Sequence, residues 1–170
     1  HSQRHHVNHQ HLERIVIEAA EQCERLDIPK IEDVIKFDQI FNNQSPHQKI
    51  FIAMERSAHH VTLKDELKNC GIGQSVKKSL KNETEKKIDQ VQNMMDSLEI
   101  ALLIGPEGGF SQRETLTIKA SIPASTVCLP NRDESKKNAV FSIGCNILRT
   151  ETAAIASLTL LNDYKYQLLC

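Results

Sequence analysis

EIALLIGPEGGF, at residues 99–110, is an apolar run that leads directly into a glycine-rich loop. Five consecutive apolar residues, 100–104, bounded by glycine and proline, are typical of a buried strand. The loop at 105–109 has hardly any side chain apart from the carboxylate of Glu107. In an open α/β sheet, ligands bind beyond the carboxyl ends of the strands, and glycine lets a ligand approach the backbone. These features favour a tight structural turn and a ligand-binding loop equally.

The loop matches neither of the common phosphate-binding patterns. It lacks the lysine and hydroxyl of G-x-x-x-x-G-K-[ST] and the spacing of G-x-G-x-x-G, and Glu107 would repel a phosphate. If the loop binds a ligand, the sequence therefore predicts a neutral or cationic one held by backbone groups.

Composition limits the classes of function. The 170 residues suit one globular domain with a core, and 21 basic against 22 acidic side chains give no overall basic field for nucleic acid. The five cysteines include no C-x-x-C pair, so we expect free thiols and no metal site. No apolar segment reaches the length of a membrane span, so we expect no membrane partner.

The hydrophobic pattern alternates between strand-like and helix-like segments. It predicts an amphipathic helix over 11–26, and Ser111 with Glu114 is typical of a helix-capping box. Alternating strands and helices predict an α/β domain with a mostly parallel sheet and helices on both faces. Residues 1–10 are expected to be a poorly ordered lead-in, and the domain to span 11–165. The other expected elements are strands at 49–54, 99–104 and 126–129, helices at 61–69, 83–98 and 111–120, a charged loop at 130–139, and a long helix starting near Cys145.

Three blocks together resemble a known family. LLIGPEGGFSQRE at 102–114, SIGCNILRTETAAIAS at 142–157 and IEAAEQCERLDIPKI at 17–31 are similar to the signature segments of RsmE-type ribosomal RNA uridine-N3 methyltransferases, of the SPOUT superfamily. The blocks span about residues 11–160, nearly the whole chain.

The resemblance implies a SPOUT-type deep trefoil knot in the C-terminal half, with S-adenosylmethionine (SAM) bound between two late loops. It implies N3-methylation of a uridine in small-subunit ribosomal RNA, with that RNA or subunit as partner, a homodimer, and a cytoplasmic location (organellar if the source is eukaryotic). The cofactor-binding residues it implies are Leu103, Ile104, Gly105, Pro106, Glu107, Gly108, Gly109, Ser142, Ile143, Gly144, Asn146, Ile147 and Leu148.

Two arginines are candidate catalytic residues. Arg149 follows the cofactor-facing stretch and would stabilise negative charge on the uracil ring, although an ion pair with Glu151 or Glu107 is an equal alternative. Arg25 would position RNA or the target base, against the alternative of a surface residue at a helix end. Glu107 either orients a ligand or shapes the turn by accepting backbone hydrogen bonds.

The chain also departs from the family pattern. Nothing in it resembles the family's N-terminal PUA-like RNA-binding domain or the first strand of the methyltransferase domain, so we expect both to be lacking. Cys145 and Asn146 stand where basic residues are usual, and the segments 71–95 and 130–140 are longer than usual. Two alternatives therefore stay open: a weakly active or inactive RNA- or ribosome-binding protein, and a methyltransferase for another RNA.

Overall fold

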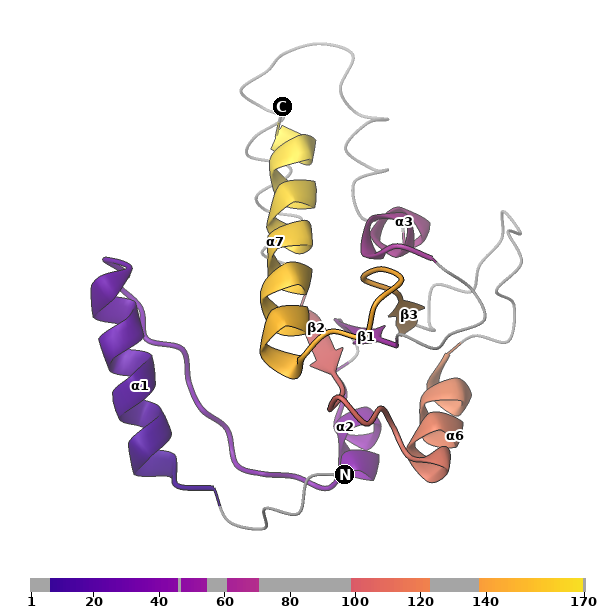
Figure 1. Ribbon diagram of the computed structural model, residues 1–170, viewed down its shortest axis with the longest axis horizontal. Helices are drawn as coiled ribbons and strands as arrows, with labels where there is room; N and C mark the ends of the chain where they lie inside the picture. Colours follow the sequence, from indigo (N-terminus) through magenta and orange to yellow (C-terminus); the bar gives the residue numbers. More distant parts are fainter. Residues whose placement is uncertain (1–6, 46, 55–60, 71–98, 123–137, 170) are drawn as a thin grey trace. The chain divides into compact units, whose positions relative to one another are not determined.

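A computed structural model of the chain describes residues 7–45, 47–54, 61–70, 99–122 and 138–169 (Figure 1). The chain divides into two compact units, one comprising Ser2–Asn42 and the other Asn43–Cys170. Within the described ranges, no helix combines the length and the apolar character needed to cross a membrane.

The smaller unit contains helices α1 (His9–Gln22) and α2 (Phe37–Asn42). The predicted amphipathic helix is confirmed as α1, which begins two residues before the expected start because Asn8 caps it. The Asn8 side chain accepts a hydrogen bond from the His11 N–H at 3.1 Å.

Helix α1 ends at Gln22, before the predicted residue 26. Glu24 adopts a left-handed backbone conformation (φ 53°), and the Arg25 N–H bonds back to the Ala20 carbonyl at 3.0 Å. This is the arrangement of a Schellman motif, which stops a helix by satisfying its last carbonyls.

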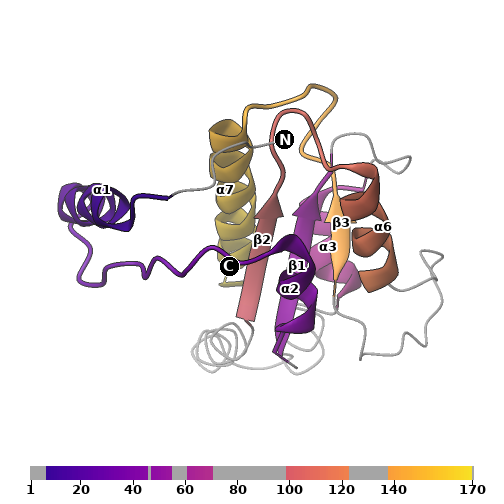
Figure 2. The same cartoon turned by 90° about the horizontal axis from the view of Figure 1, so that it is seen from below.

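The larger unit is built on a three-stranded parallel sheet of order β2-β1-β3 (Figure 2). In register, Phe51 of the central strand lies between Leu102 and Ala139. Because the strands are parallel, their carboxyl ends meet at one edge of the sheet. The strands are β1 (Gln48–Ala53), β2 (Glu99–Ile104) and β3 (Ala139–Phe141).

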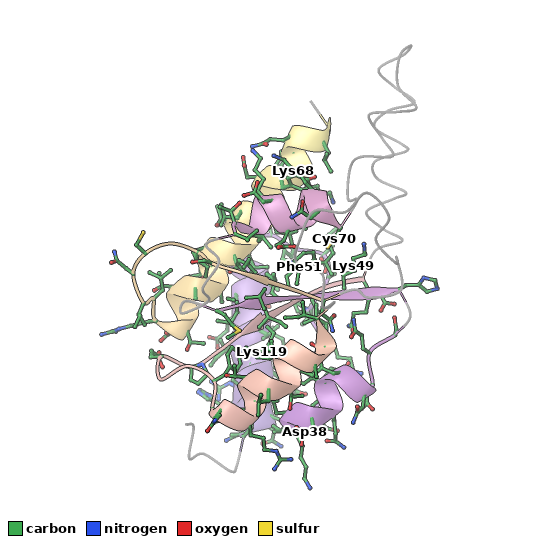
Figure 3. The ribbon with its side chains drawn as sticks, turned by 90° about the vertical axis from the view of Figure 1, so that its right-hand side faces the viewer. Asp38, Lys49, Phe51, Lys68, Cys70 and Lys119 are labelled. Atoms are coloured by element: carbon green, nitrogen blue, oxygen red, sulfur yellow. The ribbon has the colours of Figure 1, made fainter. Side chains whose placement is uncertain are left out.

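Helices cover both faces of this sheet, with α3 and α7 on one face and α6 on the other (Figures 1 and 3). Thr62 caps α3, and the predicted capping box of Ser111 and Glu114 is present at the start of α6. The predicted α/β class with a parallel sheet is therefore confirmed. The bounds are Leu63–Asn69 for α3, Gln112–Ser121 for α6 and Thr150–Leu169 for α7.

The core lies mainly between the sheet and the α3–α7 pair. Phe51 and Phe141 are fully buried there against Leu63 and Leu67 of α3 and Tyr164 of α7. The last four residues of β1, 50–53, are all buried, and burial on both faces explains why they are all apolar.

Two boundaries differ from expectation. The last helix begins at Thr150, not near Cys145, because residues 142–149 form a loop. The start of this loop is hydrogen-bonded to the segment before α3. Strand β3 begins at Ala139, the last residue of the expected charged loop. The helix expected at 83–98 and the strand expected at 126–129 lie outside the described residues, as do the segment 71–95 and most of 130–140.

Candidate functional site

A cleft of about 270 Å³ lies at the carboxyl edge of the sheet, where β1 and β2 end. The end of β1, the glycine loop after β2, and the start of α7 with the loop before it form its walls. Among the described residues that line it, Glu107 carries the only charged side chain. The described lining residues are Ala53, Met54, Ile104, Gly105, Pro106, Glu107, Gly108, Gly109, Phe110, Thr115, Ile147, Leu148 and Ala153.

The glycine loop is a tight turn as well as a cleft wall. The Gly109 N–H donates to the Pro106 carbonyl at 2.8 Å, and Gly109 has a φ of 72°, which side chains other than glycine resist. A Cβ placed on Gly105 would lie 2.9 Å from Cε2 and Cζ of Phe110, so the ring packs directly against this glycine. The two interpretations of the loop, turn and ligand wall, are therefore compatible.

The carboxylate of Glu107 is directed at the start of α7. Its Oε1 accepts a hydrogen bond from the Thr150 N–H at 3.3 Å. The hydrogen bonds that it accepts from its own N–H and from Thr150 lower the pKa of Glu107, and the positive charge of Arg149 lowers it further. Glu107 is therefore an anion at neutral pH, and its position suits a structural anchor.

The loop before α7 contributes to the cleft only through its second half. Ser142 is buried, its N–H donates to the Val61 carbonyl at 2.8 Å, and its hydroxyl donates to the Gly144 carbonyl at 3.0 Å. The first bond ties the start of the loop to the segment before α3, and the second closes a turn within the loop. Ile147 and Leu148 line the cleft, and Ile147 stays about half exposed.

The structure brings together eight of the thirteen residues expected to bind the cofactor, namely Ile104, Gly105, Pro106, Glu107, Gly108, Gly109, Ile147 and Leu148. Leu103, Ser142, Ile143, Gly144 and Asn146 are described but do not line the cleft. Sequence reasoning did not single out Ala53 and Met54, because the end of a predicted strand points to a site only once its neighbours in the sheet are known. It also did not select Phe110, Thr115 and Ala153.

The two candidate catalytic arginines have different surroundings. Arg149 immediately precedes α7, its side chain is exposed, and no carboxylate of the described residues lies within ion-pair distance of it. Arg25 belongs to the smaller unit and pairs with exposed Asp27 at 2.6 Å, a hydrogen bond that raises the pKa of Arg25 and lowers that of Asp27. Both functional assignments stay predictions.

The chemistry of the described lining residues suits a small organic ligand. Pockets for such ligands usually have volumes of about 300–1,000 Å³ with a few polar groups on apolar walls, and this cleft is slightly smaller. Glu107, the one carboxylate among the described lining residues, disfavours phosphate. No group of three or more histidine, cysteine, aspartate or glutamate side chains arranged to hold a metal occurs in the part of the chain that the structure describes.

The contact between Gly105 and Phe110 gives a first prediction. Replacing Gly105 by alanine forces the Phe110 ring to move, since the new Cβ would sit 2.9 Å from it, and we expect a loss of about 1–3 kcal/mol in the free energy of unfolding. Urea denaturation followed by circular dichroism measures it. Combining this change with Phe110→Ala should remove most of the extra loss, because the obstructing ring is gone. Strictly additive effects of the two substitutions would contradict the proposed contact.

The family model and the curated relative both point to RNA methyltransferases. The model of the RNA methyltransferase domain family matches residues 1–79 and 65–162. The chain is 32% identical over 155 residues to the ribosomal RNA small subunit methyltransferase E of Rickettsia conorii, covering 89% of this chain and 46% of that protein. The chain therefore spans less than half the length of this curated relative.

Solved structures give the same fold. A proposed methyltransferase of Legionella pneumophila, solved with its cofactor SAM bound, is 25% identical with a TM-score of 0.56, covering 91% of this chain and 45% of that one. A hypothetical protein solved by crystallography is 21% identical with a TM-score of 0.58, covering 96% of this chain and 62% of its own, and supports the fold alone.

Proposed function

Because this chain belongs to the RNA methyltransferase domain family, we propose that it binds SAM in the cleft at the ends of β1 and β2 and transfers its methyl group to RNA. The family model therefore confirms the RNA methyltransferase family that the three sequence blocks predicted. The activity, the cofactor and the substrate are proposals for this chain.

One observation carries the proposal above the others. The two segments that resemble the family's signature, at 105–109 and 147–148, lie about 40 residues apart in sequence and both line the same cleft. Neither segment alone distinguishes a ligand site from a turn. Their meeting at the carboxyl edge of a parallel sheet is the arrangement expected of a ligand site.

The described lining residues fit SAM. When bound, SAM supplies a methyl group activated by a positively charged sulfonium, and among the described lining residues only Glu107 carries a charged side chain. The glycine loop leaves backbone N–H and C=O groups close to the cleft, and such groups can bind the polar edge of an adenine. The apolar side chains of Ile104, Ile147 and Leu148 offer surface for its flat faces.

As the substrate we propose a uridine in small-subunit ribosomal RNA, methylated at N3. The name of the Rickettsia relative supports the RNA, and the resemblance supports the position on the base. This reaction removes the N3 proton and spreads negative charge onto O2 and O4 of the ring. Arg149 is the proposed source of the compensating positive charge, because it stands next to the lining residue Leu148 with no carboxylate of the described residues paired to it.

We also propose that two copies of the chain associate through α7, and that the C-terminal half forms the trefoil knot of the superfamily. The resemblance supports both. For the dimer, three large side chains in one row of α7 support it further: Ile155, Leu158 and Tyr166 are 67%, 52% and 69% exposed. Sedimentation equilibrium would contradict the dimer by returning the monomer mass, and an experimental chain trace without a threaded loop would contradict the knot.

The central experiment combines binding and transfer. We expect S-adenosylhomocysteine to bind with micromolar affinity in a calorimetric titration, and labelled methyl to pass from SAM to isolated small ribosomal subunits. Nucleoside mass spectrometry should identify the product as N3-methyluridine. Absence of binding by the folded protein would overturn the proposal. Binding without transfer would favour an RNA-binding protein without activity, and label in another nucleoside would indicate another target.

A further inference from the structure

Two hydrogen bonds run in opposite directions between the glycine loop and the start of α7. The Glu107 carboxylate accepts from the backbone N–H of Thr150 at 3.3 Å, and the Thr150 hydroxyl donates to the backbone carbonyl of Gly105 at 3.2 Å. Each segment thus uses a side chain to bind the other segment's backbone. The residues joined are 43 and 45 positions apart, so this contact is a long-range counterpart of a capping box.

The beginning of α7 needs such a contact. The first helical bond runs from the Ala153 N–H to the Arg149 carbonyl at 2.8 Å, which puts Arg149 at the N-cap position. Arginine has no side-chain acceptor for the first N–H groups of a helix. Glu107 supplies the acceptor from a distant loop, and its negative charge also interacts favourably with the positive end of the helix dipole.

The same contact lies between the two walls of the cleft. Gly105 and Glu107 belong to one wall, and Thr150 follows directly after the stretch that contains Ile147 and Leu148 of the other. A shift at Thr150 would move the backbone of its neighbour Arg149 as well. The two hydrogen bonds therefore link the two segments that line the cleft, at the residue that follows Arg149.

We propose that Glu107 and Thr150 are positioning residues that hold the two cleft walls together and direct Arg149 toward the substrate. This inference rests on the proposed function. It also assigns Glu107 a role other than proton acceptor. Its carboxylate is engaged by α7, and hydrogen bonds from its own N–H and from Thr150 lower its pKa, which makes it a weak base at neutral pH.

The test uses Thr150→Val, which keeps the shape of the side chain and removes only the hydroxyl donor, and Thr150→Ser, which restores it. We expect Thr150→Val to weaken binding of S-adenosylhomocysteine about tenfold, an effect of about 1.4 kcal/mol, and Thr150→Ser to recover most of it. We also expect kcat at saturating SAM to fall about tenfold in Thr150→Val, because Arg149 loses its alignment. Glu107→Ala should lower both quantities further, and Glu107→Gln should do so less, because its amide oxygen can still accept from Thr150.

Glu151→Gln is the matched control, since Glu151 is an exposed acid in the same first turn of α7. It should leave binding and kcat within about twofold of wild type. A purely stabilising cap would lower the melting temperature of Thr150→Val while kcat at saturating SAM stayed at the wild-type value, and that result would overturn the proposal. Equal losses in Glu151→Gln would overturn it too.

Hydrogen exchange separates this inference from the proposed function. Exchange at the first amides of α7 should be faster in Glu107→Ala than in wild type, whether or not SAM is bound. If wild type neither binds S-adenosylhomocysteine nor transfers methyl, the proposed function fails even where the exchange result is obtained. If wild type is active and exchange in Glu107→Ala is unchanged, the proposed function survives and the positioning role is wrong.

Discussion

Replacing Arg149 by alanine is expected to lower kcat for methyl transfer about 10²- to 10³-fold at saturating SAM and RNA. This is the usual effect of removing one group that stabilises charge in a transition state. Arg149 follows the lining residue Leu148, its side chain is exposed, and no acid of the described residues lies within ion-pair distance of it. Glu107 and Glu151, the two acids considered as partners, therefore do not pair with it in this structure.

The pattern of kinetic change distinguishes catalysis from binding. Affinity for S-adenosylhomocysteine should change by less than about threefold, because the guanidinium acts on the reacting base and not on the cofactor. Arg149→Lys should keep part of the activity, since it retains the charge but loses the planar fork. Lys119→Ala is the control, because Lys119 is an exposed cation on α6 (Figure 3) and does not line the cleft. Unchanged kcat in Arg149→Ala would remove this residue from the mechanism.

The parts of the fold with local signals could be predicted from the sequence. The strand Glu99–Ile104 has the predicted bounds, because its apolar run is too short for a buried helix and ends at a glycine-proline pair. The start of α6 could also be predicted from the sequence, since Ser111 and Glu114 lie three residues apart and form the whole capping box. Each of these features depends on neighbours in sequence.

The start of α7 depends on a residue far away in sequence, and local patterns could not find it. The apolar spacing continues back to Ile147, which is why the helix was expected to begin near Cys145. The chain instead enters the helix at Thr150, where Glu107 satisfies the first N–H. Strand β3 was not predicted for another reason. Its three residues, Ala139–Phe141, are too few to show an alternation of apolar and polar side chains.

In the candidate site, too, features set by local sequence could be predicted and features set by distant residues could not. The glycine loop was visible as a loop, but its use as a cleft wall became clear only when the block at 142–157 was considered with it. Ala53 and Met54 belong to the cleft because β1 lies beside β2 in parallel, and strand order cannot be read from a single strand's sequence. The pairing of Glu107 with Thr150 required the folded backbone.

Replacing Phe51 by alanine is expected to reduce the free energy of unfolding by about 3–5 kcal/mol, the typical loss for a large aromatic in a core. Phe51 is fully buried at the centre of the middle strand and packs in the cluster with Leu63, Leu67 and Phe141. Since the free energy of unfolding of domains of this size is only about 5–15 kcal/mol, the loss expected from this one substitution is a large fraction of it. The urea midpoint should fall by about 2 M.

Two further variants keep the Phe51 prediction testable if the alanine variant does not fold. Phe51→Leu should lose only about 1–2 kcal/mol, because most of the volume is kept. Leu116→Ala is the control: Leu116 is 61% exposed on α6, so the loss of its side chain should change the free energy of unfolding by no more than about 0.5 kcal/mol.

The end of β1 forms part of the cleft, yet Phe51 itself does not line it. Phe51→Leu should therefore bind S-adenosylhomocysteine as tightly as wild type wherever it is folded, and a stability loss equal to that of Leu116→Ala would show that this face of the sheet is not the core.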